Sequence, residues 1–167
     1  EFKVLDAATS DELTGLFNRR GFLTLAEYAL LTAQRRQEPV SLAFVDLDRF
    51  KHINDTWGHE EGDRALIAIA DLMKAAFRES DILARQGGDE FIILFANTSR
   101  HDAATAMETL SHNVARFNQQ AAHPWQLAFS WGCVEYDPAS HPSLNALVAT
   151  ADRLMYQAKQ KQGRERR

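Results

Sequence analysis

The feature that most constrains the fold is a pair of short apolar segments on either side of two adjacent glycines. Residues 82–85 and 91–95 are largely apolar, and the sequence QGGDE connects them. Glycine adopts positive φ angles without steric cost, so Gly87 and Gly88 suit a tight turn between two strands. The sequence therefore predicts a β-hairpin whose tip carries the carboxylates of Asp89 and Glu90.

The rest of the chain alternates between helical and strand patterns. Apolar residues recur at helical spacing in four segments, namely residues 22–36, 60–77, 102–117 and 144–159. Two further strands are predicted at residues 41–46 and 127–136. This order predicts an α/β (α+β) fold in which helices pack on an antiparallel or mixed sheet.

Composition excludes several classes of protein. The chain has 167 residues, which suits one domain, and a net charge of −4. A general nucleic-acid binder would carry a basic surplus, so we expect no nucleic-acid partner. Cys133 is the only cysteine, which argues against a disulfide framework. No apolar run approaches the roughly 18 residues of a membrane span, so we expect a soluble, cytoplasmic domain without membrane contact by this segment, although the full-length protein could be membrane-anchored.

Carboxylates at two predicted strand ends indicate a possible metal site. The sequence DLDRFKHIND at residues 46–55 places Asp46 and Asp48 at the end of a buried strand. Carboxylate oxygens suit Mg²⁺, which takes one or two protein carboxylates together with substrate phosphate oxygens. Asp89 and Glu90 repel each other unless a cation or a hydrogen-bond donor lies nearby. Together the two segments would suit a two-metal phosphoryl-transfer site.

Each acidic segment also has a simpler interpretation. The first is a strand that ends in a polar turn, with Asp48 capping the helix that follows. The second is a solvated hairpin tip. Sequence spacing does not show whether the two segments are adjacent in space, so both interpretations stay open at this point.

Motifs in four parts of the chain, with residues 46–63 as one part, match one known family and occur in the order typical of that family. Residues 85–91 have the sequence RQGGDEF, and residues 11–20 have the sequence DELTGLFNRR. Residues 46–55 and the sequence GHEEGD at 58–63 lie between them, and residues 151–159 form the last matching segment. Together these motifs resemble the GGDEF family of diguanylate cyclases, and the resemblance covers nearly the whole chain.

The resemblance implies a fold and a reaction. The fold would be a palm-like domain with a central, mainly antiparallel sheet, similar to class III nucleotide cyclases. The protein would be a nucleotidyltransferase that condenses two GTP molecules into cyclic di-GMP with release of two pyrophosphates. Each domain would hold one GTP, and two copies would meet face to face as a homodimer.

The resemblance also implies a domain arrangement. Residues 1–10 would be the end of a linker helix from an upstream sensor, and residues 11–167 would be the catalytic domain. We therefore expect the output module of a longer bacterial signalling protein.

The metal site implied by the resemblance uses Asp46, the backbone carbonyl of Leu47, Asp89 and Glu90. It would hold two Mg²⁺ ions per half-site, with Mn²⁺ as a possible substitute. Asp89 and Glu90 would be catalytic, and Asp89 would assist deprotonation of the attacking hydroxyl.

The GTP site implied by the resemblance comprises Lys51, Asn54, His59, Asp63, Gly87, Gly88 and Lys159. Asn54 and Asp63 would recognise guanine, and Lys51 would meet the terminal phosphates as a point charge. His59 would lie beside the nucleotide, although a structural turn histidine is the alternative.

The C-terminal motif departs from the family pattern. It has one extra residue before Gly163, so either Lys159 or Lys161 could take the phosphate-binding position. A frayed, solvated helix end is the simpler interpretation of this basic stretch.

The sequence RESD at residues 78–81 fits the family's RxxD inhibitory motif. Arg78 and Asp81 would bind cyclic di-GMP as an inhibitor, because an arginine fork and a carboxylate can both pair with guanine. The alternative is a solvated helix end. Many family members add an arginine from the following helix, where the corresponding region of this chain, METL at residues 107–110, has none near Thr109, so we expect weak product inhibition.

Two other functions compete with the cyclase hypothesis. A catalytically silent domain would bind GTP or cyclic di-GMP as a receptor or scaffold, but such domains usually lose the tip carboxylates, and Asp89 and Glu90 are present. A cyclase with another product is disfavoured by Asn54 and Asp63, which suit guanine.

Overall fold

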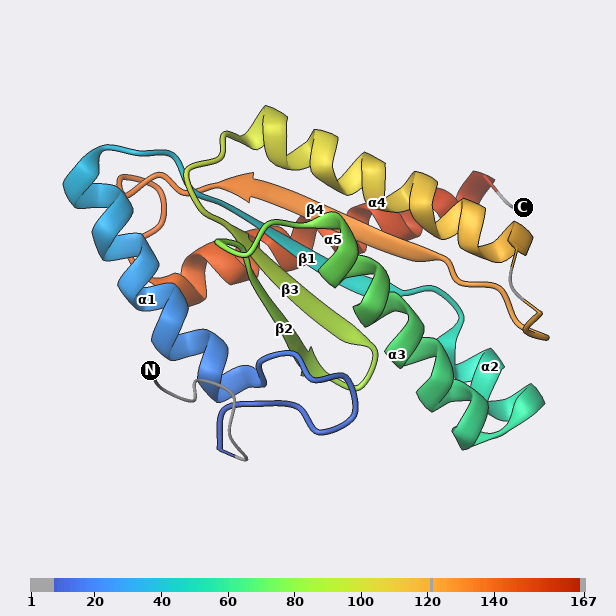
Figure 1. Ribbon diagram of the computed structural model, residues 1–167. Helices are drawn as coiled ribbons and strands as arrows, with labels where there is room; N and C mark the ends of the chain where they lie inside the picture. The colour runs from blue at the N-terminus through green and yellow to red at the C-terminus, as the bar shows by residue number, and fades with distance from the viewer. Residues whose placement is uncertain (1–7, 121, 166–167) are drawn as a thin grey trace.

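The computed structural model describes residues 8–120 and 122–165. Its elements are α1 (Arg19–Arg36), β1 (Ser41–Leu47), α2 (Phe50–Trp57), α3 (His59–Ala76), β2 (Ile82–Gly87), β3 (Glu90–Phe95), α4 (Arg100–Gln120), β4 (Phe129–Glu135) and α5 (Leu144–Glu165) (Figure 1). The strands form one antiparallel sheet in the order β2-β3-β1-β4. The predicted mixed fold with a central antiparallel sheet is confirmed.

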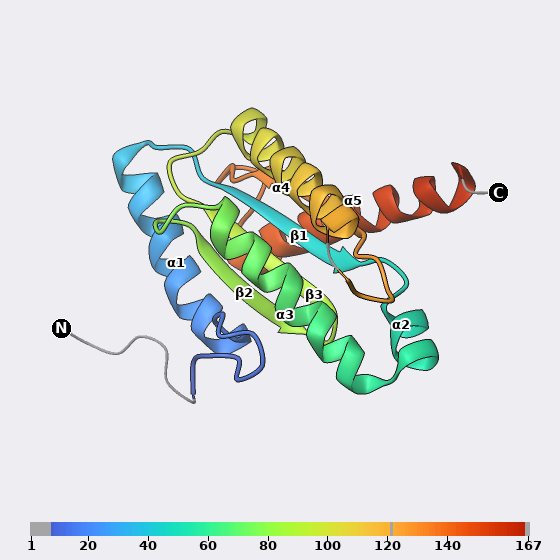
Figure 2. The same ribbon diagram turned by 45° about the vertical axis from the view of Figure 1, so that its right-hand side comes forward.

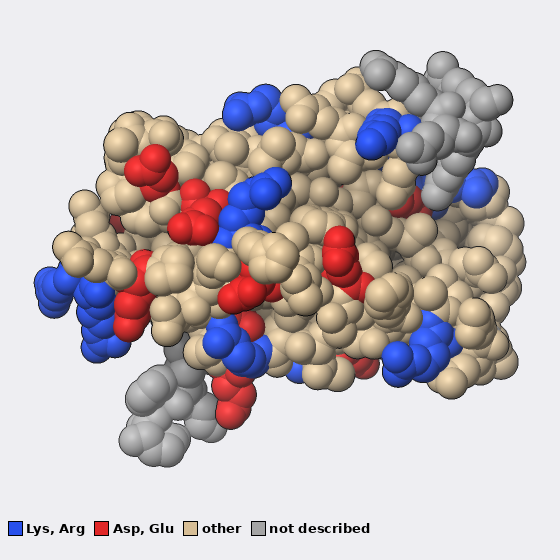
Figure 3. Space-filling view, turned by 90° about the horizontal axis from the view of Figure 1, so that it is seen from above, with Lys and Arg blue, Asp and Glu red and all other residues tan. Residues whose placement is uncertain are grey.

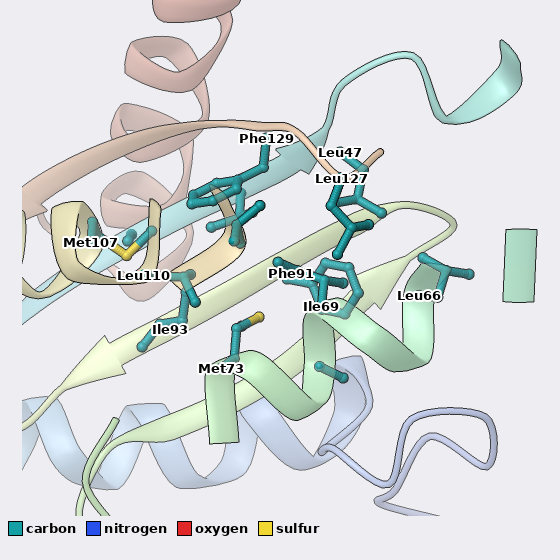
Figure 4. Packing of buried hydrophobic residues seen from close by; sticks show 14 of the residues in the cluster. Leu47, Leu66, Ile69, Met73, Phe91, Ile93, Met107, Leu110, Leu127 and Phe129 are labelled. Atoms are coloured by element: carbon teal, nitrogen blue, oxygen red, sulfur yellow. The ribbon is translucent and has the colours of Figure 1, made fainter. Parts of the chain in front are cut away.

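Helices cover both faces of this sheet (Figure 1). Alternate residues of a strand point to opposite faces, which divides the core in two. Leu42 and Phe44 share a buried cluster with residues of α1 and α5, whereas Ala43 and Val45 share one with residues of α3 and α4. Figure 4 shows the second cluster, where side chains of α3 and α4 meet those of the sheet. The same alternation directs Asp46 toward the α5 face.

The N-terminus of α1 and the whole of α2 differ most from the sequence prediction. α1 begins earlier than residue 22, because the Asn18 side chain caps it by accepting the Gly21 N–H at 2.9 Å. The sequence does not predict α2, whose eight residues bury only Ile53. Phe50, Ile53 and Trp57 have helical spacing, but eight residues are too few for the pattern to stand out in the sequence. The helix packs against α3 (Figure 2).

The loop before α1 is fixed to the rest of the domain. Of the linker helix expected at residues 1–10, residues 1–7 lie outside the described residues, and residues 8–10 form a turn and a bridge from Ser10 to Phe17 instead of a helix. Arg85 Nη1 lies 3.2 Å from Asp11 Oδ1, and Lys74 Nζ donates to the Thr14 carbonyl at 2.9 Å. The loop is therefore tied to both β2 and α3.

The surface shows mixed charge. Figure 3 shows lysine and arginine side chains interspersed with aspartate and glutamate on one face, without a continuous basic area there. In the described part of the chain, no helix has the length and apolar character needed to cross a membrane.

Candidate active site

The pairing of β1 with β3 brings the two acidic segments together. Asp46 lies opposite Glu90 in the sheet, and the Leu47 N–H donates to the Asp89 carbonyl at 3.1 Å. The turn passes through Gly88 with a φ of 52°, in the left-handed region that glycine adopts without strain. The hairpin is therefore confirmed, and its acidic tip lies beside the acidic end of β1.

Burial and mutual repulsion make these carboxylates hard to ionise. Burial raises the pKa of Asp46 to about 6, with the negative charge of Asp89 as a further cause, while the Lys159 ammonium acts in the opposite direction. Burial also raises the pKa of Glu90, and the negative charges of Asp152 and Asp89 raise it further. When they are ionised, these carboxylates repel one another, and a bound cation would reduce that repulsion.

Asp48 is a further acidic residue at this edge of the sheet, in addition to Asp46, Asp89 and Glu90. Its side chain is only 5% exposed, and its Oδ1 accepts a hydrogen bond from Ser130 Oγ at 2.8 Å. Its Oδ2 is buried without a hydrogen-bond partner. Asp48 precedes α2 but makes no capping hydrogen bond to it, since the N-cap residue is Arg49. The helix-capping interpretation of Asp48 is therefore wrong.

Lys159 of α5 points into this group of oxygens. Its Nζ lies 3.2 Å from Asp46 Oδ1, 3.8 Å from Asp48 Oδ1 and 3.5 Å from the Leu47 carbonyl oxygen. Lys161 is exposed two residues further along the helix. Of the two lysines considered from the sequence, Lys159 is the one that the structure places at the site.

The donor atoms suit a hard divalent cation. Among the residues described, no three His, Cys, Asp or Glu side chains form a ready metal cluster. However, Asp46 Oδ1 is buried, and its contact with Lys159 is an ion pair without hydrogen-bond alignment. The Leu47 carbonyl oxygen contacts the same Lys159 ammonium, at 3.5 Å. Such oxygens fit Mg²⁺ when substrate phosphates supply further ligands.

We expect Asp46→Asn to stabilise the metal-free protein at neutral and alkaline pH. The folded-state pKa of about 6 lies above the ordinary 3.8, so the charged carboxylate lowers the free energy of unfolding above pH 6. This penalty shrinks as the pH falls below the folded-state pKa, and it is lost only below the ordinary pKa of 3.8. Thermal melts in a chelator should therefore show a gain in the unfolding temperature at about pH 8 that shrinks by about pH 4.5. A variant less stable than wild type at the higher pH would contradict this account.

The expected guanine-binding residues lie where α2 meets α3. Asn54 is half-buried, and it packs against Gly62, where an added Cβ would overlap Asn54 Oδ1. Asp63 follows Gly62 and is exposed. Asn54 belongs to α2 and Asp63 to α3, and these two helices pack against each other (Figure 2).

Two of the residues expected to bind GTP lie on the surface near this junction. Lys51 Nζ pairs with Asp55 Oδ2 at 3.0 Å, and the Lys51 side chain is 89% exposed. His59 is exposed at the first position of α3. Neither belongs to the carboxylate group around Lys159, and both are open to a ligand from solvent.

Arg78 and Asp81 contact each other in a turn after α3. Arg78 Nη2 lies 3.1 Å from Asp81 Oδ1, and it donates to the Ala96 carbonyl and Thr98 Oγ1, both at 2.7 Å. The Asp81 side chain is 2% exposed, whereas that of Arg78 is 57% exposed. A cavity of about 520 Å³ lies beside them, lined in part by Phe77 and Leu83.

Some site residues were not found from the sequence. Ser130 lies opposite Asp46 on β4 and holds Asp48, and Gln162 lies 3.3 Å from the same hydroxyl. A serine and a glutamine carry no distinctive signal until the pairing of β4 with β1 is known. Arg85 also donates to the Gly88 carbonyl at 2.9 Å, which fixes the tip to the Asp11 loop.

Comparison with known sequences identifies similar proteins. The family model described as "Diguanylate cyclase, GGDEF domain" matches residues 8–166. Diguanylate cyclase DosC of Escherichia coli is 35% identical over 156 residues, which make up 93% of this chain and 34% of that protein. The chain therefore spans about a third of this curated relative.

Solved structures are similar over most of the chain. The GGDEF domain of DgcB from Caulobacter crescentus, in complex with c-di-GMP, superposes with a TM-score of 0.85 at 28% identity, covering 96% of this chain and 94% of that one. Diguanylate cyclase SiaD from Pseudomonas aeruginosa, in complex with its activator SiaC, gives a TM-score of 0.84 at 34% identity. That match covers 91% of this chain and 58% of the SiaD chain.

Proposed function

The chain belongs to the GGDEF family of diguanylate cyclases, and we propose that it condenses two GTP molecules into cyclic di-GMP and two pyrophosphates. The observation that carries this proposal is the convergence of Asp46, the Leu47 carbonyl and the tip acids at one edge of the sheet. We also propose that the domain is the cytoplasmic output module of a longer signalling protein, controlled by an upstream sensor.

The proposed reaction is a pair of phosphoryl transfers. The 3′-hydroxyl of each GTP attacks the α-phosphorus of the other, and the bond to pyrophosphate breaks as the new P–O bond forms. Asp89 accepts the hydroxyl proton on a carboxylate oxygen, and the Leu47 N–H holds its backbone in place. Lys51 and Lys159 bind the terminal phosphates.

A metal site in the same place completes the proposal. Asp46, the Leu47 carbonyl, Asp89 and Glu90 would hold two Mg²⁺ ions per half-site, or Mn²⁺ in their place. Bound Mg²⁺ would offset the negative charge that develops as pyrophosphate leaves. The raised pKa values of Asp46 and Glu90 support this assignment, because a divalent cation would favour their ionised forms.

A requirement for two copies tests the proposed function. Because each domain holds one GTP, product formation by this chain should rise more steeply than linearly with protein concentration until the dimer is saturated. Initial rates with GTP and Mg²⁺ over a dilution series measure this dependence. A rate strictly proportional to protein concentration at every dilution would contradict assembly of the site from two dissociable domains.

We expect Gly62→Ala to weaken guanine recognition. Replacing a helical glycine by alanine normally stabilises a helix by about 0.5–1 kcal/mol. Here the new Cβ would overlap Asn54 Oδ1 and lie 2.9 Å from Asn54 Cγ, so the amide must move. The KM for GTP should rise about tenfold, and the preference for GTP over ATP should fall.

Gly163→Ala is the matched control, because Gly163 is also helical and an added Cβ there meets open space. In an Asn54→Ala background, Gly62→Ala should cause little further rise in the KM for GTP. A full additional loss in that background would show that Gly62 acts independently of Asn54.

We propose that cyclic di-GMP inhibits the enzyme at Arg78 and Asp81. The exposed Arg78 guanidinium and the adjacent cavity support this assignment. Asp81 is already bonded to the Arg78 backbone and side chain, so the ligand must exchange with these internal contacts. Arg78→Ala should preserve the initial rate and raise the product concentration needed for half-inhibition. An unchanged inhibition curve would remove Arg78 from the inhibitory site.

A further inference from the structure

Lys159 contacts the same oxygens that the proposed function assigns to the metal ion. Its ammonium lies within 3.5 Å of both Asp46 Oδ1 and the Leu47 carbonyl oxygen, and Asp48 Oδ1 is 3.8 Å away. A lysine that served only to bind phosphate would be expected to extend toward solvent, as Lys161 does. The Lys159 side chain instead points toward Asp46 and is 35% exposed.

We propose that Lys159 is a built-in counterion that occupies the cation position until nucleotide arrives, and so prevents stable metal binding without substrate. This inference rests on the proposed function, because it takes the metal and GTP assignments as its starting point. The ammonium and a divalent cation cannot share these oxygens, because two positive charges about 4 Å apart repel strongly at a protein surface.

The local charges explain why Lys159 can contact the carboxylates without nucleotide and can move away from them when nucleotide binds. Asp46, Asp48, Asp89 and Glu90 together carry more negative charge than one ammonium offsets. Lys159 Nζ lies 3.2 Å from Asp46 Oδ1 and 3.8 Å from Asp48 Oδ1, so a single ammonium faces two of these carboxylates. A divalent cation therefore interacts more favourably with these oxygens than the ammonium does. The exchange is favourable when the ammonium can bind another anion. The phosphates of GTP provide such an anion.

Neighbouring hydrogen bonds fix the Asp48 carboxylate that Lys159 faces. Ser130 Oγ donates to Asp48 Oδ1 at 2.8 Å and lies 3.3 Å from Gln162 Oε1. Gln162 is three residues after Lys159, so both side chains lie on one face of α5. Lys161 falls on another face, which explains why only Lys159 reaches the carboxylates.

The exchange implies an order of binding. Without nucleotide, the lysine competes with the metal, and the site has low affinity for free divalent ions. With nucleotide, Lys159 transfers to the phosphates as the metal takes its oxygens. Metal and GTP should therefore bind cooperatively, and Lys159 should be the source of much of this coupling.

Mn²⁺ titration without nucleotide tests this proposal, with free Mn²⁺ measured by electron paramagnetic resonance. The proteins are wild type, Lys159→Gln and the matched control Lys161→Gln, each checked for a wild-type melting transition. We expect Lys159→Gln to bind Mn²⁺ at least about tenfold more tightly than wild type and Lys161→Gln to match wild type. Equal affinities for all three proteins would overturn the counterion role.

The same titration with a non-hydrolysable GTP analogue separates this proposal from the proposed function. Wild type should gain more Mn²⁺ affinity from the analogue than Lys159→Gln does. If the analogue promotes Mn²⁺ binding equally in both proteins, the coupling does not depend on Lys159 and the counterion proposal fails alone. If no protein binds Mn²⁺ even with the analogue, the metal site of the proposed function fails, and this proposal with it.

Discussion

Asp89→Asn is expected to lower the rate of cyclic di-GMP formation by at least about a thousandfold. The substitution removes the carboxylate that we propose as proton acceptor and metal ligand. It leaves the hydrogen bond from the Leu47 N–H to the Asp89 carbonyl intact, so the hairpin should keep its conformation. GTP binding should therefore persist while turnover is lost, and parallel assays of binding and product formation measure the two effects.

Asp71→Asn provides the matched control for this experiment. Asp71 lies on α3 with a side chain that is 65% exposed, and its partner Lys74 is on the same helix. Its loss should leave the rate near that of wild type, since exposed ion pairs contribute little. A wild-type rate for Asp89→Asn would remove Asp89 from the catalytic machinery.

Gly132→Ala is expected to destabilise the domain by about 3 kcal/mol, near the upper end for overpacking. Gly132 lies in β4, and an added Cβ would meet backbone atoms of α5, including the Ala151 carbonyl at 2.5 Å and the Met155 N–H nitrogen. Backbone cannot rotate away as a side chain can, so α5 would have to shift from the sheet. Chemical denaturation measures the loss.

The same substitution should also reduce turnover in the folded fraction, because α5 carries Lys159. Gly163→Ala lies in α5 with open space around the added Cβ, so it should raise stability by no more than about 1 kcal/mol and leave turnover close to wild type. A Gly132→Ala domain as stable as wild type would show that α5 can move away from β4 at little cost.

Elements with a strong local signal were predicted from the sequence. The apolar segments around Gly87 and Gly88 indicated the hairpin, and the apolar run ending at Asp46 indicated a buried strand. Both are dictated by side-chain pattern and turn chemistry within a few residues. α2 is too short for its three apolar residues to give a clear helical signal, and it packs against α3.

The arrangement of the site could not be predicted in the same way. The approach of Asp46 to the hairpin tip depends on the pairing of β1 with β3, which joins residues far apart in the sequence. The inward direction of Lys159, despite one extra residue before Gly163, depends on the helical phase of α5. The contacts of Arg78 with Ala96 and Thr98 depend on the turn between β3 and α4.

Product analysis tests the central claim most directly. The chain would be fused to a dimerising coiled coil, because a lone domain holds only half of the proposed site, and incubated with GTP and Mg²⁺. Chromatography with mass spectrometry would then quantify nucleotides and pyrophosphate. We predict one cyclic di-GMP and two pyrophosphates for every two GTP consumed. No cyclic product from a dimer that still binds GTP would contradict the cyclase assignment and favour a receptor role.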